Sequence, residues 1–168
     1  MASRRVRVGV GPRFDFAHRK LYSVAVKKPP ITATLTWQGD LEFRAATPRT
    51  EIILDSKSTA GPSPPEALAM ALAGCMAMDV VDIVIKGRHP LSALDVRLTG
   101  ERQDDPPRRF VHFSLHFVIG GAVPEQAIQR AIDLSRDKYC SVWHSLRQDV
   151  TLDTTFEVNA SSLDSTKG

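Results

Sequence analysis

The stretch that decides the fold reads Gly61-Pro-Ser-Pro-Pro-Glu66-Ala-Leu-Ala-Met-Ala-Leu-Ala-Gly-Cys75-Met-Ala-Met-Asp79. Its two consecutive prolines suit the first turn of a helix, where backbone N–H groups have no intrahelical partner. Ser63 followed by Glu66 forms the pattern of a capping box. No charged or strongly polar side chain occurs in the 12 residues from Ala67 to Met78. This pattern predicts a helix buried on all sides, and the run is shorter than the roughly 20 residues of a membrane span.

Charge and composition set the expected domain boundaries. Residues 1–30 hold eight lysines and arginines against a single acidic residue, a net charge of +7. Because the whole chain carries +3, residues 31–168 carry −4. We therefore predict a basic N-terminal extension over 1–30, one domain over 31–158, and a flexible tail rich in Ser, Thr and Asp over 159–168.

The basic extension is compatible with contact to nucleic acid, to an anionic membrane surface, or with an organelle transit peptide. We favour a solvated extension or an extra edge strand, because Val6, Val8 and Val10 alternate with other residues as in a strand. Aromatic residues do not interleave with the charges as they do in binders of single-stranded nucleic acid. The N-terminus also lacks the apolar segment of a secretory signal. We expect a cytoplasmic protein with no nucleic-acid partner and no membrane insertion.

The other elements follow from apolar periodicity. Strands are expected over 31–37, 41–45, 51–54, 94–99, 110–119 and 150–156, and helices over 64–86 and from 124 to about 138, where the pattern breaks and restarts. Gly87 is expected at the C′ position of the first helix. Helices that follow hairpins indicate an α+β fold with antiparallel sheets. Since one sheet face cannot cover a helix that is apolar all round, a second copy of the helix is the simplest cover, which predicts a homodimer.

Cys75 is the sharpest candidate for chemistry. A thiol reacts as its thiolate and burial raises the pKa of a thiol, so a reactive Cys75 needs a cation nearby. Its helical neighbours supply none, and Asp79 would oppose ionisation if it faced the sulfur. We expect the cation to be Arg44 or Arg49, held by Glu66. Glu66 lies roughly 13 Å from Cys75 along the helix axis, so a site that uses both must be shared between two chains; otherwise Glu66 only caps the helix.

Cys140 lies where the second helical pattern restarts. A helix N-terminus stabilises a thiolate, which suits a resolving thiol, while a buried structural thiol is the alternative. Cys140 and His144 are spaced as two metal ligands on one helix face or as a nucleophile and its base. Because no third or fourth ligand is evident, we expect no metal. His112 and His116 lie about 13 Å apart on one strand, and the chain has no phosphate-binding or dinucleotide-binding motif, so we expect no cofactor.

Two segments resemble a known family. The stretch from Gly61 to Ile83 resembles the signature helix of the OsmC/Ohr superfamily, the osmotically inducible protein C and organic hydroperoxide resistance proteins. Lys138-Tyr-Cys140-Ser-Val-Trp resembles the second-cysteine segment of that family. The order of the surrounding elements agrees over roughly residues 31–158. The Gly-Gly-Arg-Asp-Gly pattern of the hydroperoxide-resistance branch is replaced by Trp37-Gln-Gly-Asp-Leu-Glu-Phe-Arg44, and the interval from Glu66 to Cys75 is one residue shorter, which places the chain in a less characterised OsmC-like branch.

The resemblance implies an intertwined homodimer whose sheets wrap two central helices, with thiol-dependent reduction of organic hydroperoxides. By the same resemblance, Cys75 is the peroxidatic cysteine, Cys140 the resolving cysteine, and Glu66 the glutamate that holds an activating arginine, for which Arg44 is the nearest match. The expected cycle forms a Cys75 sulfenic acid, then a Cys75–Cys140 disulfide, which an external dithiol reduces. The alternatives are a dimer that binds an apolar ligand or senses redox state through Cys75 without efficient turnover, and acyl transfer by Cys140 with His144.

Overall fold

The structure is a computed structural model that describes residues 28–159. Contacts divide the chain into two units, residues 1–32 and 33–168. Most of the predicted basic extension and of the predicted C-terminal tail lie outside the described residues. The architecture below concerns the second unit alone.

The first sheet is an antiparallel meander of β1 (Thr34–Gly39), β2 (Glu42–Ala46) and β3 (Glu51–Asp55), in the order expected from the sequence. Its strand register aligns Leu35 with Ala45 and Ile52, and Trp37 with Phe43 and Leu54. Because side chains alternate between the faces of a sheet, these six apolar residues share one face. That face is open in this chain: Leu35 is 56% and Trp37 64% exposed.

The central helix is α1 (Pro64–Lys86). It begins as predicted, with the Glu66 carboxylate accepting a hydrogen bond of 2.7 Å from the backbone N–H of Ser63. Its end differs in detail from the prediction, because Gly87 keeps a right-handed conformation at the C-cap. The left-handed residue is Arg88, with φ of 60°, and its N–H bonds to the carbonyl of Ile85 at 2.9 Å.

One face of α1 is buried and the other is open, so the prediction of a helix buried on all sides is not met within one chain. Leu72, Met76, Val80 and Val84 are at most 1% exposed. Met70, Met78 and Ile85 on the open face are 62%, 74% and 58% exposed. By length and composition alone α1 could also span a membrane, since an 18-residue window of it has a mean hydropathy of 2.1. The apolar run from Ala67 to Met78, which is shorter than a span, is only part of this helix.

The second sheet contains β4 (Leu91–Arg102), β5 (Phe110–Gly121) and β6 (Thr151–Asn159) in that order. β4 and β5 form the expected antiparallel hairpin, but β6 is parallel to β5, which corrects the prediction of purely antiparallel sheets. The reason is the helical crossover between them, made of α2 (Glu125–Leu134), the π-helical turn η1 (Ser135–Tyr139) and α3 (Ser141–His144). A crossover of this length carries the chain back to the end at which β5 began, as a parallel pair requires.

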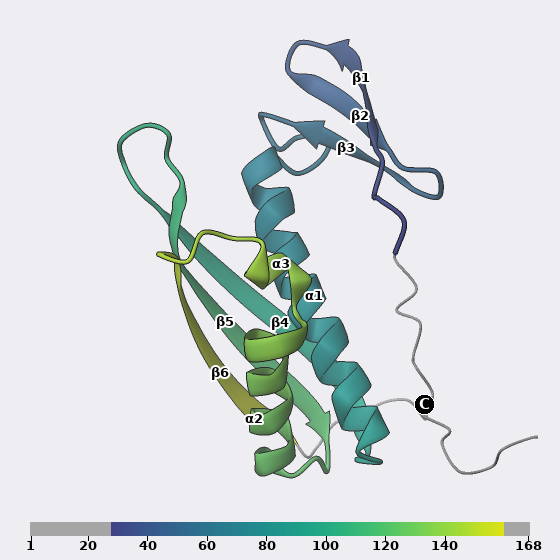
Figure 1. The fold of residues 1–168 in the computed structure, drawn as a ribbon, viewed down its shortest axis with the longest axis vertical. Helices are drawn as coiled ribbons and strands as arrows, with labels where there is room; N and C mark the ends of the chain where they lie inside the picture. The colour runs from purple at the N-terminus through teal and green to yellow at the C-terminus, as the bar shows by residue number, and fades with distance from the viewer. Residues whose placement is uncertain (1–27, 160–168) are drawn as a thin grey trace, which may run out of the picture. The chain divides into compact units, whose positions relative to one another are not determined.

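The core lies between this sheet and the helices, which cover one of its faces (Figure 1). The buried face of β5 carries Phe113, Leu115, Phe117 and Ile119, as its alternation predicts. The opposite face carries His112 and His116, whose Nδ1 atoms each lie 2.8 Å from a threonine hydroxyl of β6. Each histidine thus has its own hydroxyl partner on β6.

Phe117→Ala should lower the free energy of unfolding by about 3–5 kcal/mol, because it empties a fully buried ring site beneath both helices. Val118→Ala, one residue further on the opposite face of β5, is the matched control and should cost well under half as much. Urea denaturation followed by tryptophan fluorescence measures both. Equal losses for the two variants would contradict the assignment of the core face.

Candidate functional site

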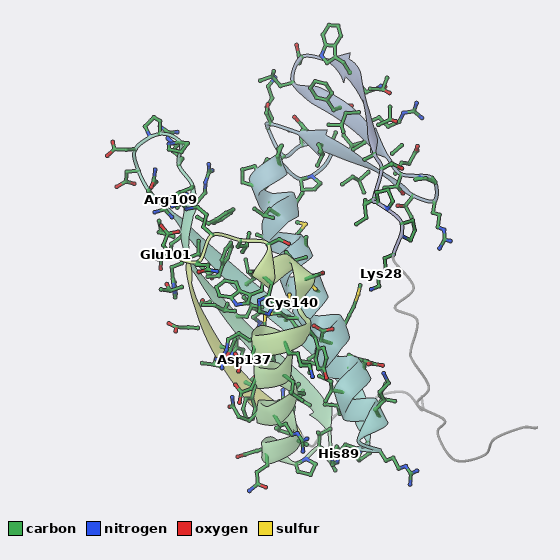
Figure 2. The ribbon with its side chains drawn as sticks, in the orientation of Figure 1. Lys28, His89, Glu101, Arg109, Asp137 and Cys140 are labelled. Carbon is green, nitrogen blue, oxygen red and sulfur yellow. The ribbon has the colours of Figure 1, made fainter. Side chains whose placement is uncertain are left out.

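The two cysteines, 65 residues apart in the sequence, come together in the fold. Cys75 lies in the middle of α1 and Cys140 lies between η1 and α3, which packs against α1. Their Sγ atoms lie within 4.8 Å of each other, and both are free thiols. Figure 2 shows Cys140 at this junction of the crossover with α1. A disulfide bond, with an S–S length of about 2.05 Å, would require the two sulfur atoms to move closer together.

The π-helical turn sets the position of Cys140. Its backbone N–H donates to the carbonyl of Ser135 at 2.8 Å, a hydrogen bond that spans five residues as in a π-helix. Cys140 is then the N-cap of α3, and the backbone N–H of Trp143 donates to its Sγ at 3.4 Å. The predicted restart of the helical pattern at Cys140 is therefore confirmed.

The two thiols differ in accessibility and in protonation. Cys140 is 0% exposed, whereas Cys75 is half-buried. Burial, assisted by the adjacent Cys75 thiol, raises the pKa of Cys140 to about 12, although the N–H of Trp143 opposes this shift. At neutral pH Cys140 is a protonated thiol, and Cys75 is the sulfur that an incoming molecule can reach.

Asp79 joins the two cysteines. One of its carboxylate oxygens lies within 4.8 Å of both sulfur atoms, and its Oδ2 accepts a hydrogen bond of 2.8 Å from the Ser135 hydroxyl. Ser135 is fully buried and comes from a segment 56 residues away. The i, i+4 spacing of Cys75 and Asp79 was the available signal in the sequence, but no local pattern points to Ser135.

Among residues 28–159, neither Glu66 nor Arg44 forms a hydrogen bond with a cysteine, and no hydrogen bond joins the two to each other. Glu66 accepts hydrogen bonds from the hydroxyls of Ser58 and Ser63, the latter at 2.7 Å, and these bonds lower the pKa of Glu66. Arg44 forms an exposed ion pair with Glu51 at 3.4 Å. Within one chain, Glu66 caps the N-terminus of α1, and Arg44 links β2 to β3 through its ion pair with Glu51.

A cavity of about 540 Å³ lies beside the N-terminal half of α1. Glu66, Ala73 and Arg102 contribute to its lining, and the Arg102 guanidinium lies over the ring of Phe110, 5.7 Å from its centroid. At roughly 100° per helical residue, Ala73 and Cys75 point about 200° apart around α1. The cavity therefore opens on the opposite side of the helix from the thiols of the same chain.

His144 does not complete the pair with Cys140 that its spacing suggests. Its side chain is exposed, and among residues 28–159 no hydrogen bond joins the imidazole to Cys140. The groups close to the Cys140 sulfur are Cys75 and Asp79.

Comparisons with known proteins agree with this fold. The profile of the OsmC-like protein family matches residues 55–155, and the chain belongs to this family. Protein YhfA of Escherichia coli K12 is 43% identical over 112 residues, which cover 66% of this chain and 84% of YhfA.

Solved structures extend the comparison. A hypothetical protein from Aquifex aeolicus VF5 superposes with a TM-score of 0.73 at 27% identity, over 79% of this chain and 98% of that one. An organic hydroperoxide resistance protein OsmC from Legionella pneumophila superposes with a TM-score of 0.60 over 78% of this chain and 100% of its own, at 14% identity. The second similarity concerns the fold alone.

Iodoacetamide should alkylate Cys75 well before Cys140 at pH 8. Cys140 is 0% exposed and its pKa is about 12, so its thiolate fraction stays small until the solution is strongly alkaline. Raising the pH towards 10 should increase the Cys140 rate without making it equal to that of Cys75. Peptide mass spectrometry of timed samples measures both sites, and protein unfolded in urea is the control in which the two rates should converge. Faster labelling of Cys140 in the folded protein would reverse the assigned roles.

Proposed function

We propose that the protein is a thiol-dependent peroxidase that reduces organic hydroperoxides to alcohols. The observation that carries this proposal is the pairing of an accessible thiol, Cys75, with a buried thiol, Cys140, within 4.8 Å. An enzyme of this kind needs a first sulfur that the peroxide can reach and a second sulfur that is protected until the first has been oxidised.

The proposed cycle has three steps. The Cys75 thiolate attacks the terminal oxygen of the hydroperoxide, the O–O bond breaks, and the alkoxide leaves as the alcohol after taking a proton, while Cys75 becomes a sulfenic acid. The Cys140 sulfur then attacks the Cys75 sulfur, the S–O bond breaks, and water leaves with the thiol proton. An external dithiol, expected in a cytoplasmic setting, reduces the disulfide by exchange and is itself oxidised.

The surroundings of Cys75 favour an organic hydroperoxide over hydrogen peroxide. Leu68, Ala71 and Met78 occupy the same side of α1, at positions i−7, i−4 and i+3 from Cys75. Leu68 and Met78 are 39% and 74% exposed in one chain, so an alkyl group that reaches Cys75 beside a partner chain would meet apolar side chains. Met76, in contrast, is fully buried in the core and does not line the approach. The Legionella protein that shares this fold is named an organic hydroperoxide resistance protein.

We further propose a homodimer in which each active site is shared. The open apolar faces of α1 and of the β1–β3 sheet need a cover, and a second copy of the chain provides one for both. Glu66 and Cys75 point to opposite sides of α1, so a glutamate that serves Cys75 must come from the partner. We propose that the activating arginine also comes from the partner. Our candidate is Arg44, which would leave its ion pair with Glu51 when the dimer forms.

If no arginine reaches Cys75 in the dimer, the same geometry supports the second candidate function, a thiol redox sensor or an apolar-ligand binder with little turnover. The specific observation in its favour is that Arg44 and Glu66 are each engaged by other residues of their own chain.

Cys75→Ser should abolish the consumption of cumene hydroperoxide with a dithiol reductant, because the attacking sulfur is gone. Cys140→Ser should still undergo one oxidation, leaving a Cys75 sulfenic acid that dimedone labels. Hydroperoxide loss is followed by a ferric–xylenol orange assay and the label by mass spectrometry. Full consumption by Cys75→Ser would refute the peroxidase proposal; rapid alkylation of Cys75 with negligible consumption by the unaltered protein would favour the sensor.

Trp37→Asp should shift the protein from dimer towards monomer in sedimentation velocity experiments, since it puts a charge on the open apolar face of the meander. Thr36→Asp is the matched control, because the neighbouring side chain points to the other face of the same strand. The control should sediment as the unaltered protein does. Identical behaviour of both variants would contradict the proposed use of this face.

A further inference from the structure

Cys75, Asp79 and Cys140 have the composition and spacing of a metal-binding cluster. One ligand atom from each residue lies within 4.8 Å of the other two. A thiolate sulfur about 2.3 Å and a carboxylate oxygen about 2.1 Å from a tetrahedral Zn²⁺ are themselves about 3.6 Å apart. The cluster therefore needs to close by roughly 1 Å, which side-chain rotation can supply.

The cluster also has supporting interactions outside its three ligands. The Ser135 hydroxyl donates to Oδ2 of Asp79 at 2.8 Å, which leaves the other carboxylate oxygen available. The backbone N–H of Trp143 donates to Sγ of Cys140 at 3.4 Å. Hydrogen bonds of this kind orient metal ligands and contribute to affinity.

A bound cation would balance the charge that the three ligands carry once both thiols have lost their protons. Two thiolates and a carboxylate would place three negative charges together, and no lysine, arginine or histidine in the described part of the chain forms an ion pair with Asp79. A bound divalent ion neutralises most of that charge and deprotonates coordinating thiols. Thiolates select Zn²⁺ over Mg²⁺ or Ca²⁺, which prefer oxygen ligands.

We propose that the reduced protein binds one Zn²⁺ ion through Cys75, Asp79 and Cys140, with the fourth position open to solvent, and that oxidation of the two cysteines releases it. Binding displaces the two thiol protons into solution. On oxidation by a hydroperoxide or a diazene oxidant, the two sulfurs give up two electrons and form an S–S bond. Zn²⁺ then leaves with its charge unchanged, because one carboxylate does not hold it.

This site goes beyond the proposed peroxidase and does not depend on it. A zinc-bound protein has both sulfurs occupied, so the bound ion would slow the oxidation of the pair by a hydroperoxide relative to the metal-free protein. The Asp79 carboxylate, which has no part in the proposed peroxidase cycle, would act as a ligand of the ion.

The test is a metal titration of the reduced full-length protein without peroxide. Co²⁺ should give a thiolate charge-transfer band and the visible bands of a tetrahedral site, and Zn²⁺ should displace it at one ion per chain in competition with a chromophoric chelator. Asp79→Asn should weaken Zn²⁺ binding at least about tenfold and Ser135→Ala about tenfold. Asp82→Asn is the matched control on the same helix, where Asp82 pairs with Lys86 at 2.6 Å, and it should bind as the unaltered protein does.

Three results would overturn the proposal: equal affinity of Asp79→Asn and Asp82→Asn, absence of the thiolate band with Co²⁺, or unchanged binding after diamide has oxidised the cysteines. Circular dichroism of Asp79→Asn shows whether the variant is folded. If it is not, Co²⁺ binding to Cys75→Ser and Cys140→Ser, each of which should lose the site, decides the question. A protein that binds zinc as described but consumes no peroxide would separate this site from the peroxidase proposal.

Discussion

The packing of α1 against the helical crossover is the interaction on which the site depends. Leu72, Met76, Val80 and Val84 fix one face of α1 on the core, and this orientation turns Cys75 and Asp79 towards the crossover. The π-helical turn η1 places Ser135 and Cys140 beside them. Two thiols and a carboxylate meet because apolar packing, to which Cys140 itself belongs, fixes the helix, and because the hydrogen bond from Cys140 to Ser135 closes the π-helical turn.

The same packing leaves a large apolar surface unused. The open face of α1 and one face of the β1–β3 sheet expose apolar side chains to water. Exposed apolar surface of this extent is typical of an interaction site. A dimer would bury them and would also bring Glu66 of one chain towards the thiol of the other. The meander adds little to the core of one chain, since its only buried residue in the described structure is Asp55 at its end. We propose that the meander covers a partner chain instead.

Much of the fold could be predicted from the sequence, because the signals are local. The alternation in β5, the prolines and Glu66 at the start of α1, and the break before Cys140 each determine their own element. The direction of β6 could not be predicted in this way, since it depends on where the crossover returns the chain. The end of α1 was right in position but wrong in geometry, because Arg88 rather than Gly87 takes the left-handed conformation.

The candidate site was predictable in part. The two cysteines are evident from the sequence by their residue type and their neighbours. The rise per residue of an α-helix is enough to show that Glu66 cannot contact Cys75 of the same chain. The sequence presents Asp79 only as a charge that would oppose ionisation of Cys75. Nothing local in it points to Ser135, because the contact between the two residues joins segments 56 residues apart. The sequence favours an arginine on the meander, and in the structure Arg44 of this meander forms an ion pair with Glu51.

The central claim is that Cys75 and Cys140 of one chain form a reversible redox pair. Its most direct measurement is the mass and the non-reducing peptide map of the reduced protein after one equivalent of an organic hydroperoxide. We expect an intact mass lower by two hydrogen atoms and a single cross-linked peptide joining Cys75 to Cys140, both reversed by a dithiol. A Cys75 carrying added oxygen beside a free Cys140, or a Cys75–Cys75 bridge between chains, would contradict it.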